Sequence, residues 1–156
     1  MPESPNKRVY VDSNVLIYAV EGVPATADPA KKLITFLRVN RNLTFTSEFT
    51  LAEVLAPPKA RGAWPLHIKR RVYLDLLIFS GAITLIPVTR DILIGTADLR
   101  KTTSLKLPDA IHLMSAIRSD CKFMVSGDAD FKRLPSGMIQ VRPDDVGIDK
   151  LLRNLA

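Results

Sequence analysis

Short, almost continuously apolar runs alternate with helical patterns along this chain, and this alternation limits the fold more than any other feature. The runs lie at residues 8–11, 43–46, 83–86, 123–126 and 138–141. They are too short for helices, and they lack the alternation of a sheet with one face in water. Strands buried on both faces belong to parallel sheets covered by helices. The sequence therefore predicts a three-layer α/β/α fold with a central, mostly parallel sheet of four to five strands.

Helix signals fill the segments between these runs. Asp12 or Ser13 can cap a first helix. Gly22 and Pro24 end that helix, and the Asp28-Pro29 pair opens a second one. Further helices are predicted after Ser47 to about residue 55, over 65–80 and 90–103, from Leu107 to Ile117, and over 144–154.

The length of 156 residues fits one domain, and no repeat or linker divides it, so we expect a single domain over residues 1–156. The one cysteine, Cys121, excludes an internal disulfide and sits beside an apolar run, which favours a buried, inert thiol. No segment has the ~18–20 apolar residues that span a bilayer. The N-terminus lacks the apolar core of a signal peptide. These features predict a cytoplasmic protein with no membrane partner.

Four acidic residues stand out by their position in this pattern. Asp12 directly follows the first predicted strand, and Asp128 follows the fourth across a Ser126-Gly127 turn. Glu53 and Asp109 lie in predicted helices among apolar neighbours. Open α/β sheets bind their ligands at the carboxyl ends of the strands. We therefore expect these four carboxylates to converge at that edge.

Carboxylates that converge in this way need a cation. Two unit charges ~4 Å apart repel by about 4 kcal/mol at an effective dielectric constant near 20, so several such pairs do not all stay ionised unaided. A divalent cation removes the conflict, and Mg²⁺ or Mn²⁺ prefers oxygen ligands. With one cysteine and two histidines, the chain lacks a ligand set for zinc. Taken singly, each acid also has a simpler interpretation as a helix cap, a turn residue or a helix-surface group.

Four segments resemble the motifs of PIN-domain ribonucleases. They are residues 11–17 with Asp-Ser-Asn, 47–55 with Ser followed six residues later by Glu, 107–116 with Asp-Ala, and 126–131 with Asp-Ala-Asp-Phe. Their order and spacing are similar to the family from about residue 8 to residue 141. Within the family, the chain looks most like the VapC-type toxins of toxin–antitoxin systems.

This resemblance implies a PIN-like fold and a Mg²⁺- or Mn²⁺-dependent endoribonuclease that hydrolyses RNA phosphodiester bonds. It implies that Asp12, Glu53, Asp109 and Asp128 are the catalytic, metal-binding acids. Asn14, Ser126 and Asp130 would lie behind them and orient them or a water molecule. A carboxylate not fully engaged by metal, Glu53 or Asp109, would help to deprotonate the attacking water. His112 stands in a helix that is usually apolar at that point, and we interpret it as a hydrogen-bonded, partly buried histidine rather than a ligand.

The net charge of +6 favours a polyanionic partner, and the resemblance makes that partner RNA. The candidate RNA-binding residues are Arg61, Lys69, Arg70, Arg71, Lys106, Lys132 and Arg133. Each of them is equally well explained as an ordinary solvated residue. Apolar stripes on the helices at 27–38, 47–55 and 65–80 favour a protein partner, either an antitoxin or a second copy in a homodimer, beside plain core packing.

Other functions stay open at this stage. A catalytically inert PIN-like module could bind RNA or support assembly, and a PIN nuclease could serve RNA processing. A phosphatase with an aspartyl nucleophile would need Asp-x-Asp after the first strand, where this chain has Asp12-Ser13-Asn14. A nucleotide-binding fold lacks support because the chain has no Gly-rich phosphate loop.

Overall fold

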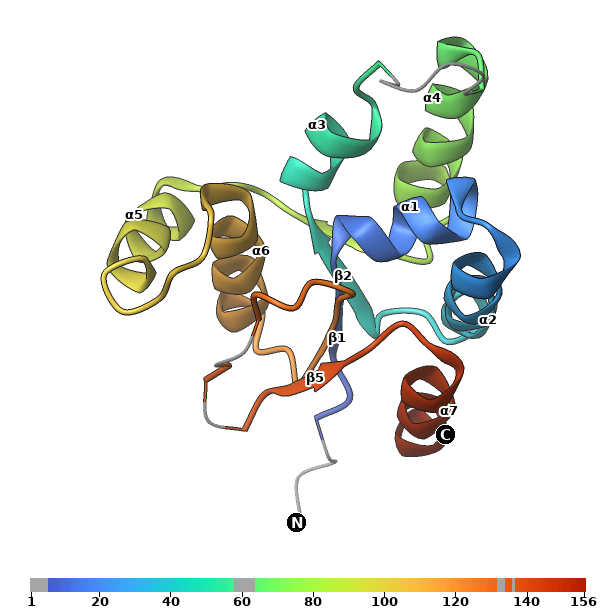
Figure 1. The fold of residues 1–156 in the computed structure, drawn as a ribbon. Helices are drawn as coiled ribbons and strands as arrows, with labels where there is room; N and C mark the ends of the chain where they lie inside the picture. Colours follow the sequence, from blue (N-terminus) through green and yellow to red (C-terminus); the bar gives the residue numbers. More distant parts are fainter. Residues whose placement is uncertain (1–5, 58–63, 132–133, 136) are drawn as a thin grey trace.

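The apolar runs form a parallel sheet at the centre of the molecule (Figure 1). The computed structural model describes residues 6–57, 64–131, 134–135 and 137–156, and its strand order is β3-β2-β1-β4-β5. The strands are β1 (Val9–Val11), β2 (Thr44–Ser47), β3 (Thr84–Ile86), β4 (Phe123–Val125) and β5 (Ile139–Val141). Every neighbouring pair is parallel, which confirms the predicted sheet.

Helices cover both faces of this sheet, so the predicted three layers are present (Figure 1). One face carries α1 (Ser13–Glu21), α2 (Pro24–Val39) and α7 (Asp145–Leu155), and the other carries α5 (Arg90–Leu99) and α6 (Leu107–Arg118). The short α3 (Phe49–Val54), α4 (Leu66–Leu74) and the π-helical turn η1 (Asp75–Phe79) extend the first layer. Among the described residues, no helix combines the length and the apolarity needed to cross a membrane.

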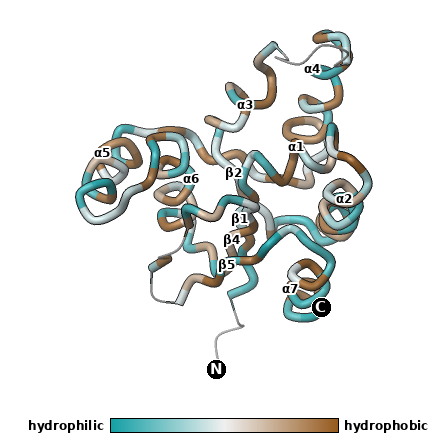
Figure 2. Tube along the Cα trace, viewed as in Figure 1, coloured by the Kyte–Doolittle hydropathy of each residue, from teal (hydrophilic) through white to brown (hydrophobic). Residues whose placement is uncertain are grey.

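The side chains of β1 divide between two cores. Val9 and Val11 face the core beneath α1 and α2, whereas Tyr10 faces the core beneath α6 together with Met124. All four side chains are fully buried. Figure 2 shows apolar residues concentrated in the central strands, while the outer helices alternate between apolar and polar residues. Each buried aliphatic side chain contributes about 1.5–3 kcal/mol, which explains how strands this short hold the sheet.

The second helix begins earlier than predicted. The Asp28-Pro29 start is wrong, because α2 begins at Pro24 with extended Val23 as its N-cap. Proline at the first helical position costs nothing, since that backbone nitrogen has no helical partner. Pro29 lies inside the helix and is buried. Its nitrogen cannot donate the usual helical hydrogen bond, and the packing of its ring compensates for this loss.

The predicted helix over 65–80 is present but changes its winding. It continues from α4 into η1, where the Ser80 N–H donates to the Asp75 carbonyl at 2.7 Å in the wider spacing of a π-helix. Ser47 is a residue type typical of helix N-caps, but the residue before α3 is Glu48. The Ser47 hydroxyl still accepts a hydrogen bond from the Phe49 N–H at 3.0 Å.

Candidate metal centre

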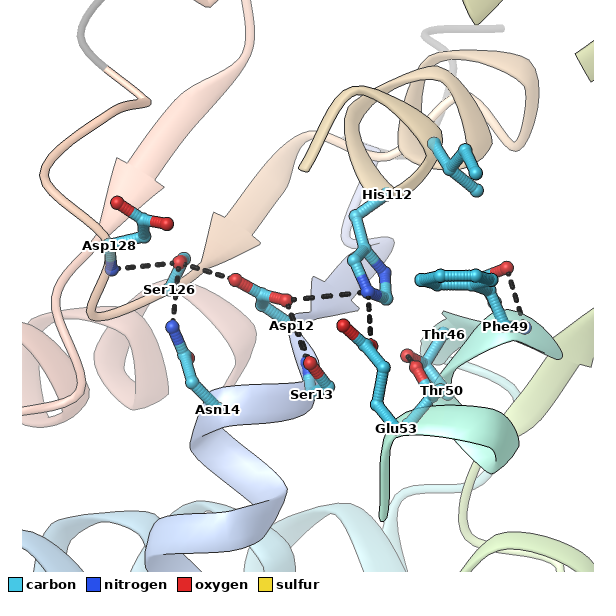
Figure 3. Close-up of polar contacts among 12 residues, drawn as sticks. Asp12, Ser13, Asn14, Thr46, Phe49, Thr50, Glu53, His112, Ser126 and Asp128 are labelled. Atoms are coloured by element: carbon cyan, nitrogen blue, oxygen red, sulfur yellow. Dashed lines mark hydrogen bonds and ion pairs between the residues drawn. The ribbon is translucent and has the colours of Figure 1, made fainter. Parts of the chain in front are cut away.

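The pairing of β1 with β4 brings the residues after both strands to one edge of the sheet. Val11 pairs with Val125, and the Asp12 N–H donates to the Val125 carbonyl at 3.0 Å. Asp12 then caps α1, while Ser126 and Asp128 follow β4 (Figure 3). The predicted meeting of Asp12 and Asp128 in one region is therefore a direct result of strand order.

Asp12 is buried and held from two sides. Its side chain is only 4% exposed. Oδ1 accepts from the Ser13 N–H at 2.7 Å, and Oδ2 accepts from the Ser126 hydroxyl at 2.7 Å. Burial raises the pKa of Asp12 above its usual value, while nearby His112 and the Ser126 hydrogen bond act in the opposite direction. A cation bound beside this carboxylate would offset the cost of keeping its charge buried.

Asn14 and Ser126 fix the loop that carries Asp128. The Ser126 hydroxyl accepts from the Asp128 N–H at 3.0 Å and lies 3.4 Å from the Asn14 amide nitrogen. Asn14 Oδ1 accepts from the Gly127 N–H at 3.3 Å. Ser126 thus contacts an acid directly, as expected, whereas Asn14 acts on the loop rather than on a carboxylate.

Asp109, Asp128 and Asp130 form the tightest carboxylate group, which we call the acidic trio. One oxygen from each lies within 4.8 Å of the others. The Asp130 N–H donates a hydrogen bond to Asp128 Oδ1 at 2.8 Å, which holds Asp130 beside Asp128. Burial, together with the charges of Asp128 and Asp12, raises the pKa of Asp109 to about 6. Asp130 therefore lies among the candidate ligands themselves, not behind them as the sequence suggested.

Glu53 reaches the site from α3 and meets His112 instead of the trio. His112 Nε2 lies 2.7 Å from Glu53 Oε2 and 3.7 Å from Asp12 Oδ1 (Figure 3). The His112 ring is 1% exposed, more deeply buried than predicted. Burial lowers its pKa, but Glu53, Asp12 and Asp109 together outweigh this and raise it above the usual value. Asp109 and His112 are three residues apart and therefore lie on one face of α6, and this spacing was the sequence signal that could have placed His112 at the site.

The chemistry of the donors fits a hard divalent cation. The trio offers oxygen atoms only, and such sets suit Mg²⁺ or Mn²⁺. Asp12 raises the pKa of Asp109, and Glu53 raises that of Asp12. The four predicted acids and Asp130 therefore share one negative electrostatic site, in which cation binding relieves mutual repulsion.

The four predicted RNA-binding residues that the structure describes do not lie together. Lys106 is exposed at the N-terminal end of α6, the same end that carries Asp109. Lys69 is 7% exposed and donates to the Ala56 carbonyl at 3.2 Å, so it faces inward. Arg70 and Arg71 line a groove beside α2. Arg61, Lys132 and Arg133 lie outside the described residues.

Three solved structures similar to this chain are toxin–antitoxin complexes. A toxin–antitoxin complex from Klebsiella pneumoniae is 26% identical, with a TM-score of 0.62 over 86% of this chain and 97% of that one. VapBC2 from Rickettsia felis, bound to a DNA fragment from its promoter, is 19% identical, with a TM-score of 0.64 over 86% and 97%. DNA-bound VapBC from Salmonella typhimurium is 17% identical, with a TM-score of 0.62 over 87% and 98%. The last two likenesses concern the fold alone.

A search of curated proteins finds no significant match. A family model described as PIN domain matches residues 9–137, which include β1, all the described acids of the site and the loop after β4. The match covers most of the chain, and the parallel sheet with its acidic edge agrees with the resemblance drawn from the four motifs. This chain belongs to the PIN domain family.

Proposed function

We propose that this chain is a Mg²⁺- or Mn²⁺-dependent endoribonuclease and the toxin of a toxin–antitoxin pair. The observation that carries the proposal is the convergence of buried Asp12, Glu53 and the acidic trio at the carboxyl edge of the sheet. Membership of the PIN family supports the nuclease activity. Similarity to the Klebsiella toxin–antitoxin complex supports the toxin role.

The residues of the site divide the work of hydrolysis. The acidic trio, with Asp12 beside it, would hold the cation, and Ser126 fixes Asp12 through its 2.7 Å hydrogen bond. When bound, Mg²⁺ or Mn²⁺ offsets the carboxylate charges and acts as a Lewis acid toward the phosphate. Glu53 lies apart from the trio with 27% of its side chain exposed, so we assign to it the acceptance of the proton from the attacking water.

RNA is held at the rim of this negative site by positive charge. Lys106 is the described candidate closest in the fold to the trio, since it precedes Asp109 on α6. Lys132 and Arg133 follow the Asp128–Phe131 loop in the sequence. Phosphate contacts of this kind make binding strongly dependent on salt concentration.

The test is metal binding and RNA cleavage by matched variants. Wild-type protein is expected to bind Mn²⁺ in calorimetry and to cut single-stranded RNA, whereas Asp12→Asn and Asp128→Asn lose at least about 100-fold in cleavage rate. Asp98→Asn is the control, because Asp98 is exposed on α5 and pairs with Lys101. An Asp12→Asn protein that cuts at the wild-type rate would refute the proposal. Absence of both metal binding and cleavage would instead indicate an inert RNA-binding or assembly module.

A groove beside the C-terminal half of α1 is our candidate site for the antitoxin. It has a volume of about 1060 Å³ and lies between α2 and the α4–η1 segment. Ile34, Leu76 and Phe79 form part of its apolar lining. Its polar lining is mostly basic, with Lys31, Arg38, His67, Arg70 and Arg71 beside Thr35 and one acid, Asp75. This combination fits an amphipathic segment with acidic side chains, so the groove is assigned to an acidic antitoxin segment. The predicted homodimer stays a prediction.

A further inference from the structure

His112 joins two elements of the site that are far apart in the sequence. Its ring lies on α6, buried between Tyr10 of β1 and α3. Nδ1 is 2.7 Å from the Tyr10 hydroxyl, and Nε2 is 2.7 Å from Glu53 Oε2. The rings of Tyr10 and Phe49 meet the imidazole edge-on, each with centroids 5.9 Å away. Both ring nitrogens are therefore within hydrogen-bond distance of a partner, and two aromatic rings contact the imidazole.

The carboxylate at Nε2 sets the direction of the hydrogen bonds around the ring, because an ionised carboxylate accepts and cannot donate. The Ser47 N–H donates to the Tyr10 oxygen at 3.0 Å, and the Tyr10 hydroxyl can donate its own hydrogen to Nδ1. An Nδ1 that accepts this proton places the ring hydrogen on Nε2, where it faces Glu53. A doubly protonated ring also carries a hydrogen on Nε2. In either state, Nε2 donates to the Glu53 carboxylate.

We propose that His112 is a positioning residue for Glu53, oriented in turn by Tyr10. This inference rests on the proposed nuclease function, in which Glu53 accepts the proton of the attacking water. Glu53 is anchored on α3, a helix of six residues, and part of its side chain is exposed. The hydrogen bond from His112 Nε2 fixes one oxygen of the Glu53 carboxylate. It also holds this carboxylate on the side of Asp12, whose Oδ1 lies 3.7 Å from the same Nε2.

Core packing alone does not account for this histidine. The other buried positions of α6 are apolar, among them Ala110, Leu113 and Ala116, except for Ser115, whose hydroxyl donates to the Ile111 carbonyl of the same helix. A leucine would fill the same space without the cost of burying two polar nitrogens. If packing alone explains His112, an apolar replacement should preserve activity better than a hydrogen-bonding one. If the hydrogen bond to Glu53 matters, the hydrogen-bonding replacement should preserve activity better.

The experiment compares His112→Gln with His112→Leu in the full chain. Glutamine can donate from near the Nε2 position, whereas leucine fills the volume without a donor. We expect His112→Leu to lose 10- to 100-fold in kcat on single-stranded RNA, with KM changed less than about twofold, and His112→Gln to retain kcat within about threefold. Ser115→Ala is the control in the same helix, since the Ser115 hydroxyl donates to the Ile111 carbonyl of α6. Leucine performing as well as glutamine would overturn the positioning role.

Two further readouts keep the test decisive. Tyr10→Phe removes the partner of Nδ1 and is expected to lower kcat by several-fold, which covers the case in which His112→Leu does not fold. In metal-free wild-type protein, ¹⁵N NMR is expected to show a hydrogen on Nε2 of His112; a ring with hydrogen on Nδ1 alone contradicts the inference. A wild type that neither binds Mn²⁺ nor cuts RNA refutes the proposed function itself. An active wild type with an equally active His112→Leu variant refutes only the role of His112.

Discussion

The carboxylates at the edge of the sheet lie close together against their own repulsion. Asp109 shows the effect most clearly, because burial and the charges of Asp128 and Asp12 raise its pKa to about 6. Ionising Asp109 at neutral pH therefore costs free energy in the folded, metal-free protein but not in the unfolded chain. Such a site is less stable when empty than when a cation offsets the charges.

This leads to a prediction about stability and pH. A carboxyl whose pKa rises from 3.8 to about 6 on folding stabilises the fold below 3.8, and that contribution is lost as the pH rises through 6. Asp109→Asn, which is neutral at every pH, is expected to raise the unfolding free energy of metal-free protein by about 1 kcal/mol at pH 7, a value reduced for solvent screening. The gain should vanish near pH 4. Urea denaturation in a chelator checks this, with Asp98→Asn as control; destabilisation by Asp109→Asn at pH 7 would contradict it.

Cys121 gives a second prediction at the scale of a residue. The thiol is free and buried, and burial raises its pKa to about 12 even though Arg8 acts in the opposite direction. Thiolate is the reactive form, so the native protein is expected to resist a thiol-specific reagent at pH 8 and to react fully after denaturation. The rate of absorbance change with a disulfide reagent measures this. Immediate labelling of the native protein would show that the thiol is accessible.

Single elements determine which parts of the site were predictable from sequence. Asp12 and Asp128 follow apolar runs that pair in one sheet, so strand position alone brought them together. Tyr10 and Asp12 point to the same side of β1, and Asp109 and His112 share a face of α6. These periodicities were visible, but the sequence does not say that α3 packs where Glu53 meets His112. That contact depends on how helices pack across the sheet, which no local pattern encodes.

Helix α4 shows a limit of another kind. Lys69, Arg70 and Arg71 are adjacent in the sequence and were grouped as candidate RNA contacts, but their side chains leave the helix in different directions. Lys69 turns inward, within 3.7 Å of Glu21 Oε1, and Glu21 also accepts a hydrogen bond from Tyr73. Charge in the sequence marks a basic segment, whereas the rotation of the helix decides which charges reach solvent.

A pair of lysine substitutions tests this assignment. Lys69→Met is expected to lower the unfolding free energy by about 2 kcal/mol, because it leaves Glu21 partly buried without its cation, and to leave RNA affinity unchanged. Lys106→Met should leave stability unchanged and reduce the salt dependence of RNA binding by about one phosphate contact. Denaturation curves and binding titrations at several salt concentrations measure both effects. If Lys69→Met weakened RNA binding, Lys69 would have to be counted again among the RNA-binding residues.

At the scale of the whole molecule, charge is separated. The chain carries a net charge of +6, but five of its acids gather at the carboxyl edge of the sheet while a mostly basic rim borders the apolar groove between α2 and α4. Phe79 is 76% exposed at that groove, an unusual position for an aromatic side chain without a partner. The acidic edge and the groove have no described lining residue in common, so catalysis and partner binding can be altered separately.

The final prediction uses that separation. Phe79→Glu places a negative charge where we propose an acidic antitoxin segment, so it should weaken binding at least about tenfold through lost apolar contact and repulsion. Its RNA cleavage and Mn²⁺ binding should equal those of the wild type, because Phe79 does not line the acidic site. Val146→Glu is the matched control, since Val146 is 78% exposed on α7 and does not line the groove. The measurement is inhibition of cleavage by the co-purified product of the adjacent reading frame. Full inhibition of Phe79→Glu would move the partner to another surface and leave the nuclease proposal intact, because the two depend on different residues.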